Sequence, residues 1–114
     1  MNLLDRLREN VLADNDLLRK NDHKGDVFET PRDVDFTFKT EDPKKAEDLA
    51  SYINGMNFGI ATVQHGDGNP VWVVVVIRMP ITQHLLCSVS AFMVCLGRIY
   101  GAEYDGWGSV LQPK

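Results

Sequence analysis

The chain has 114 residues, which fits one compact domain, because domains commonly hold roughly 100–150 residues. Hydrophobic residues make up 44% of it and charged residues 25%, a balance that excludes collagen-like, coiled-coil-only and wholly disordered chains. Twelve Lys and Arg against sixteen Asp and Glu give a formal net charge of −4 without any basic cluster, which argues against direct binding of nucleic acid.

Two features indicate a cytoplasmic protein. Cys87 and Cys95 would lie about 12 Å apart along a helix axis, farther than a disulfide spans, and are expected to be free thiols in a reducing compartment. Residues 1–9 mix charges with leucines and so lack the apolar core of a signal peptide, and residues 79–97 contain too many polar side chains and a proline for a membrane span.

Residues 2–20 are predicted to form an amphipathic helix, because Leu4, Leu7, Val11 and Leu18 recur at helical spacing. This stripe either packs against the rest of the chain, which we favour, or docks a partner or a second copy.

A loop rich in Asn, Asp, Gly and Pro is predicted over residues 21–32. We therefore divide the chain into an N-terminal helix and linker, residues 1–23, and a compact domain, residues 24–114.

The compact domain begins with a strand and a helix. Residues 34–39 alternate apolar and polar side chains, which is typical of a strand with one buried face. Asp42 and Pro43 are then suited to cap and start a helix, which Gly55 is expected to close in the left-handed conformation.

A hairpin should follow. Residues 58–65 are predicted to form a strand, residues 66–69 a tight turn, and residues 71–77 a second strand. The last of these has seven consecutive apolar residues and is expected to be central and covered on both faces.

Thr82 and Gly101 mark the start and the end of a second helix, and residues 103–111 suit an irregular or bulged edge strand. The inward stripe predicted for this helix consists of Leu85, Val89, Phe92, Leu96 and Ile99, and Leu86 and Met93 are expected to widen it.

The order β-α-β-β-α-β predicts an α+β, ferredoxin-like split fold, in which two helices cover one face of a four-stranded antiparallel sheet, with an extra N-terminal helix. The apolar strand 71–77 suggests that the other face is covered as well, either by the N-terminal helix or by a second copy in a homodimer.

No residue pattern specifies catalysis, a cofactor or a metal. His84 and Cys87 have the spacing of a base beside a nucleophile, but an apolar helix favours buried packing, and only a polar pocket with both at its mouth would support an enzyme. The histidines lack metal-ligand spacing, and Asp14 and Asp16 lack the glycine and distal glutamate of a calcium loop.

Two segments are unusual: residues 31–36, Pro-Arg-Asp-Val-Asp-Phe, and residues 104–108, Tyr-Asp-Gly-Trp-Gly. Because the first and last strands of this fold are antiparallel neighbours, Arg32 is expected near Trp107 or the residues after it. Arg32 then either holds an irregular edge in place or belongs to an exposed aromatic hot spot. Hot-spot chemistry and position nominate as partner-binding residues Arg32, Tyr104, Asp105 and Trp107.

Both segments resemble the family of regulators of ribonuclease activity B, the ribonuclease E inhibitor proteins. Residues 103–109 resemble the family's E/D-Y-D-G-W-G-T/S ending, residues 31–36 resemble its P-R-x-V-D-F opening, and the likeness covers about residues 24–112. The resemblance implies a ferredoxin-like protein without catalytic activity or cofactor, which binds ribonuclease E and lowers RNA cleavage. The alternative is a small-molecule-binding module with a pocket at a dimer interface.

Overall fold

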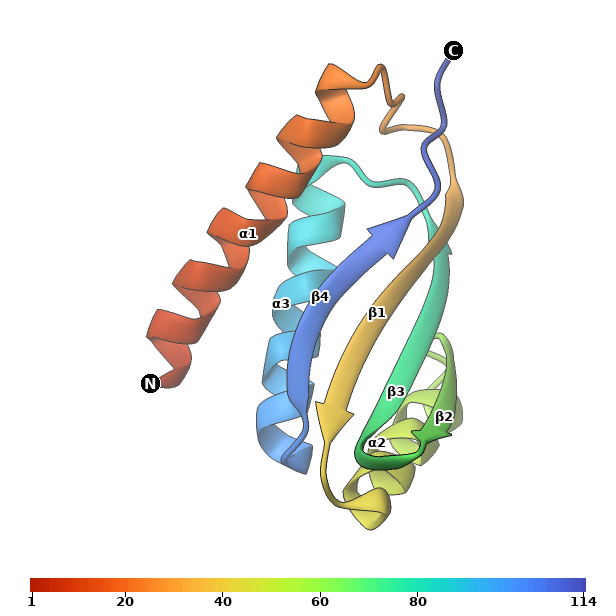
Figure 1. The fold of residues 1–114 in the computed structure, drawn as a ribbon. Coiled ribbons are helices and arrows are strands. Elements are labelled where there is room, and N and C mark those ends of the chain that lie inside the picture. Colours follow the sequence, from red (N-terminus) through yellow and green to blue (C-terminus); the bar gives the residue numbers. More distant parts are fainter.

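The computed structural model describes residues 1–114 as one antiparallel sheet and three helices (Figure 1). In chain order the elements are α1 (Leu3–His23), β1 (Arg32–Thr40), α2 (Pro43–Gly55), β2 (Ile60–Gly66), β3 (Gly68–Met79), α3 (Gln83–Tyr100) and β4 (Glu103–Ser109). The strand order β2-β3-β1-β4 is that of the ferredoxin-like fold, so the predicted architecture is confirmed, including the extra N-terminal helix.

Strand β4 pairs with β1 through a bulge, as its glycine-rich sequence predicts. Phe36 lies opposite Trp107, whereas Phe38 lies opposite Tyr104, so two residues of β4 face one residue of β1 between these pairs. Gly106 lies in this bulge with φ of 103°, a conformation that side chains with a Cβ rarely adopt.

The core lies between the sheet and the pair α2 and α3. Alternate residues of β1 and β3 point into it, and Val34, Phe36 and Phe38 are fully buried. Asp42 caps α2 as predicted, its carboxylate accepting a hydrogen bond from the Lys44 amide at 2.9 Å. Gly55 is still helical, and Asn57, with φ of 58°, adopts the positive backbone angle expected for that glycine.

Helix α3 is turned relative to its predicted stripe. Leu86, Met93 and Leu96 are buried as predicted and Ser90 joins them, whereas the predicted inward residues Leu85 and Ile99 are exposed. The helix is apolar on most sides, so hydrophobicity could not fix its orientation. The two small residues Ser90 and Gly97 let the helix approach the sheet closely and therefore decide which side faces inward.

Helix α1 packs along α3 beside the β4 edge, on the same side of the sheet as the other helices (Figure 1). Of the two covers considered for the opposite face, the N-terminal helix is therefore excluded. Its stripe is also turned: Leu4 and Val11 are exposed, and the buried positions are Asn10, Asp14 and Leu18, with Asn21.

The face of the sheet away from the helices is open. Strand β3 is central, as predicted, but Trp72, Val74 and Val76 are only half-buried, and no part of the chain lies over them. The prediction that both faces of β3 are covered is therefore not met within this chain. Only the neighbouring strands shield these three side chains, from the sides. No helix has the length and apolar character needed to cross a membrane.

Candidate functional site

A polar network is buried where α1, α3 and β4 meet. Asp14 accepts hydrogen bonds at 3.1 Å from both the Trp107 indole Nε1 and the Ser90 hydroxyl. Asn10 Nδ2 donates to Ser90 Oγ at 3.0 Å and to Asp14 Oδ2 at 3.3 Å. Because the Ser90 hydroxyl donates to Asp14, the Tyr104 hydroxyl, 2.9 Å away, donates to Ser90.

The carboxylate in this network has donors around it but no ion-pair partner. Burial raises the pKa of Asp14 above its ordinary value, and the hydrogen bonds from Ser90 and Trp107 only oppose that shift. Burial also raises the pKa of the Tyr104 hydroxyl, which keeps it a neutral donor. The network therefore attaches α1 to α3 and β4 through buried hydrogen bonds.

Hydrophobic periodicity could not reveal this network, because its residues on α1 are polar. Asn10, Asp14 and Asn21 occupy inward positions four and seven residues apart, a spacing that reads as a solvated face when only apolar residues are counted. The available signal was the match between this polar stripe and Ser90, the one polar side chain buried in the mostly apolar helix α3.

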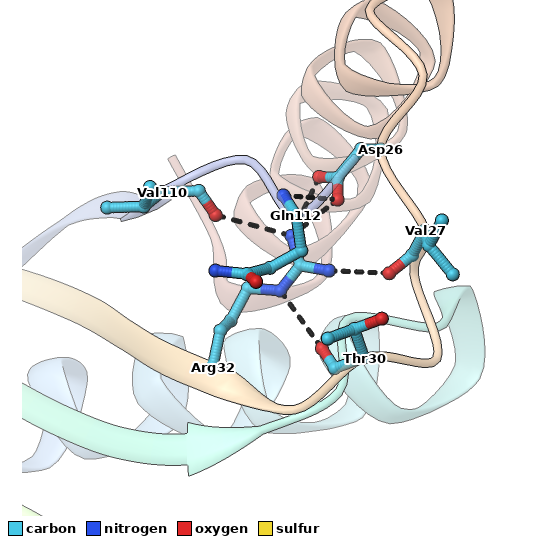
Figure 2. Close-up of polar contacts among 6 residues, drawn as sticks. All are labelled: Asp26, Val27, Thr30, Arg32, Val110 and Gln112. Atoms are coloured by element: carbon cyan, nitrogen blue, oxygen red, sulfur yellow. Dashed lines mark hydrogen bonds and ion pairs between the residues drawn. The ribbon is translucent and has the colours of Figure 1, made fainter. Parts of the chain in front are cut away.

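Arg32 forms a second buried cluster at the start of β1 (Figure 2). Its Nη1 donates to both carboxylate oxygens of Asp26, at 2.7 and 2.8 Å, and to the Val110 carbonyl at 3.4 Å. Nη2 donates to the Val27 carbonyl at 2.6 Å, and Nε donates to that of Thr30 at 3.1 Å. The guanidinium thus ties the linker after α1 to the segment after β4, as the structural reading of Arg32 predicts.

The same cluster anchors the C-terminal segment. The Gln112 amide donates to Asp26 at 3.1 Å, the Val27 amide donates to the Gln112 carbonyl at 2.9 Å, and Asp26 forms a β-bridge with Pro113. The linker after α1 and the C-terminal segment therefore meet at one buried ion pair (Figure 2).

Three of the four residues nominated for partner binding have internal roles. Arg32 and Tyr104 are each 2% exposed and Trp107 is 8% exposed, and their polar atoms are engaged in the two clusters. A partner could contact them only if those clusters opened. Asp105 alone is exposed, and it lies 3.8 Å from the Lys39 ammonium. Most of the nominated side chains in the two family-like segments therefore stabilise the fold.

His84 and Cys87 do not form an activated pair. Both line an open depression of about 380 Å³ between α1 and α3, and no hydrogen bond joins them. Burial and the nearby charge of Asp14 raise the pKa of the Cys87 thiol, which opposes formation of a nucleophilic thiolate. No three His, Cys, Asp or Glu side chains are grouped closely enough to hold a metal ion.

The open sheet face carries an apolar stripe beside a charged border. Trp72, Val74 and Val76 follow one another along β3, and Ile60 of β2, 69% exposed, lies opposite Val76. Aromatic and aliphatic side chains exposed together in this way are typical of protein-binding surfaces.

The border on β1 and β4 is mostly acidic. Lys39 lies 3.8 Å from Glu103 and from Asp105, and Arg78 lies 3.5 Å from Asp33. Asp35, also exposed, has no ion-pair partner.

Comparison with known proteins agrees with the fold and with the two segments. A search of curated proteins found no match. The family model described as Regulator of ribonuclease activity B matches residues 12–109, which is most of the chain and includes all four strands. The chain therefore belongs to the family of regulators of ribonuclease activity B.

Proposed function

We propose that this protein binds the endonuclease ribonuclease E and lowers its RNA-cleaving activity without itself catalysing a reaction. The observation that carries the proposal is the family match over residues 12–109, which is a match to regulators of ribonuclease activity and not to enzymes. The raised thiol pKa of Cys87 opposes a nucleophilic role and so fits a protein that binds without catalysing a reaction.

The surface chemistry favours a protein partner over RNA. The net charge is −4, and the open sheet face combines apolar side chains with an acidic border, which repels a phosphate backbone but accepts basic side chains. We place this action in the cytoplasm, because Cys87 and Cys95 are both free thiols, as expected in a reducing compartment.

Purified components test the proposal. We expect ribonuclease E to bind the immobilised protein with a Kd on the order of 1 μM or lower, and its cleavage of a defined RNA to slow as the protein is added in excess. An unrelated ribonuclease acting on the same RNA should be unaffected, and the protein alone should leave the RNA intact. Failure to retain ribonuclease E, or an unchanged cleavage rate at saturating protein, contradicts the proposal.

A thermal-shift comparison separates this function from the alternative of a small-molecule-binding module. A ligand that binds only the folded state raises its melting temperature. We expect stabilisation by ribonuclease E; stabilisation by a metabolite and not by the ribonuclease would favour the alternative.

A further inference from the structure

We propose that the open face of the sheet is the docking surface, and that it binds a basic amphipathic helix of the partner. In naming ribonuclease E as the protein that carries this helix, the inference rests on the proposed function. The surface is defined by the apolar stripe and Arg78 of β3, by Ile60, and by the outward side chains of β1 and β4, and is called the open face below.

The two family-like segments meet on this face as well as in the core. Phe36 and Trp107 are cross-strand neighbours on the buried side, and the adjacent pair Asp35 and Gly108 lies on the outer side. A Cβ added to Gly108 would meet no atom within 4 Å. Asp35 therefore has open space on one side, and it has apolar Val76 opposite it on the other.

That arrangement gives Asp35 the environment of a recognition carboxylate. It has no ion-pair partner, and the missing side chain at Gly108 leaves room for a long cation to lie across β4 and reach it. A Lys or Arg side chain bound there would place its alkyl stem on Val76 and its charge at the carboxylate.

The charge of the whole face selects the same kind of partner. Its carboxylates, Asp33, Asp35, Glu103 and Asp105, outnumber its cations, Lys39 and Arg78, by four to two, which leaves a net charge of −2. Two copies of the chain packed face to face would oppose like charges, and RNA would be repelled. A segment with basic residues beside an apolar stripe complements both halves of the face.

The dimensions suit a short helix. Residues Trp72 to Val76 span about 13 Å of strand, and two turns of helix rise about 11 Å. Apolar side chains at every third or fourth position of such a helix would cover the stripe, with flanking Lys or Arg over Asp35. The aromatic cluster on the helical side, by contrast, packs on itself, with Phe58 and Phe92 ring centroids 5.0 Å apart.

The first experiment compares variants in binding to ribonuclease E. Asp35→Asn removes the unpaired charge without changing shape, and Gly108→Leu fills the space beside it without changing charge. We expect each to weaken binding about tenfold or more, because either change removes the contact between a partner cation and Asp35. The control Asp16→Asn alters another exposed carboxylate, on α1 and outside the open face, and should bind as the wild type does.

Loss of binding can be distinguished from loss of folding, because the stability of each variant is measured in parallel. Melting temperatures close to that of the wild type establish that each variant folds, and Val74→Lys, a substitution at the centre of the stripe, supplies an independent third test. If the wild type binds ribonuclease E and all three variants bind it with the same affinity, the inference is overturned and the proposed function stays intact. Loss of binding in Asp16→Asn as well overturns it too.

A second experiment does not need the nuclease. A synthetic helical peptide of Leu and Lys is titrated into the isotopically labelled protein, and a Leu and Glu peptide of the same pattern serves as control. We expect amide shifts at Asp35, Val74 and Gly108 with the basic peptide only. If the wild type fails to bind ribonuclease E but this result holds, the proposed function fails and the docking chemistry stands. Shifts confined to the helical side, or no shifts, overturn the inference.

Discussion

Two buried charged side chains, Asp14 and Arg32, stabilise this molecule in different ways. Arg32 faces the carboxylate of Asp26, so its charge is compensated within the cluster. Asp14 accepts hydrogen bonds from neutral donors, Trp107 and Ser90, and no cation pairs with it. A paired buried charge costs most when its partner is removed, whereas an unpaired carboxylate has a cost that depends on pH.

Replacing Asp14 separates its roles as acceptor and as charge. Asp14→Ala leaves the indole Nε1 and the Ser90 hydroxyl without their acceptor, and we expect a loss of about 1–3 kcal/mol in the free energy of unfolding. Asp14→Asn keeps a carbonyl oxygen for Trp107 and should lie within about 1 kcal/mol of the wild type. Urea denaturation measured by tryptophan fluorescence and circular dichroism gives both values.

The stability of the wild type relative to Asp14→Asn should depend on pH, with a definite sign. Because burial raises the pKa of Asp14 in the folded state, the unfolded chain loses this proton first as the pH rises. The contribution of Asp14 is therefore fully present below the unfolded pKa near 4, and it is lost as the pH rises through the folded value. The wild type should lose stability relative to Asp14→Asn as the pH rises above about 4, and a constant difference between them would contradict the shift.

Among the elements, strands were predicted more accurately than the faces of helices. The alternation in β1 and the glycine-rich sequence of β4 specify one buried side each, and both the pairing and the bulge are found. In α3 the apolar residues surround the helix, and in α1 the inward stripe is polar, so hydrophobic periodicity selected Leu85 and Leu4 although both are exposed. Helix orientation was decided by Ser90, Gly97 and Asp14, whose roles depend on contacts between distant segments.

The candidate site shows the same limit. Position in the fold correctly placed Arg32 near the chain that follows Trp107, because antiparallel neighbours bring those ends together. Hot-spot chemistry could not tell that Trp107 points inward, since one residue along a strand reverses the face. Gly108, the residue after Trp107, and Asp35, which lies opposite Gly108 on β1, therefore reach the open face instead.

Gly97 sets the distance between α3 and the start of β4. A Cβ at this position would lie 2.5 Å from the Ala102 carbonyl oxygen and 3.4 Å from the Phe38 ring. The Ala102 amide also donates to the Gly97 carbonyl at 2.9 Å, closing the helix, so the backbone cannot easily move away.

We therefore expect Gly97→Ala to destabilise the fold by about 1–3 kcal/mol, although alanine is the better helix former. Gly55→Ala is the matched control, because that glycine is also helical and a Cβ there meets no atom within 4 Å. Its stability in thermal and urea unfolding should equal or exceed that of the wild type. A stabilised Gly97→Ala would show that α3 can shift on the sheet.

At the scale of the whole molecule, the two buried clusters attach the peripheral segments to the ferredoxin-like core. The Asp14 network holds α1 to α3 and β4, and the Arg32 cluster holds the linker and the C-terminal segment to β1. The family-like segments supply Trp107 to one cluster and Arg32 to the other. Their inward side chains hold β1 and β4 in register, and this register also brings Asp35 beside Gly108 on the open face.

Removal of the Arg32 charge tests this connection across the molecule. Arg32→Met leaves the Asp26 carboxylate buried without its cation, and we expect a loss of about 3–5 kcal/mol in the free energy of unfolding. The double variant Arg32→Met with Asp26→Asn should recover part of that loss, because no unpaired charge stays buried. Arg19→Met, which breaks an exposed pair with Asp16 at 2.9 Å, should change stability by less than about 1 kcal/mol.

The effect should also be directional. Because Val110 and Gln112 contact the Arg32 and Asp26 pair, amide hydrogen exchange in residues 110–113 should accelerate in Arg32→Met more than exchange in the α2 core. Uniform acceleration throughout the chain would mean that the pair supports global stability without specifically anchoring the C-terminal segment. Selective release would show that one ion pair holds the C-terminal segment to the linker after α1. Binding at the open face should then persist while that segment is free.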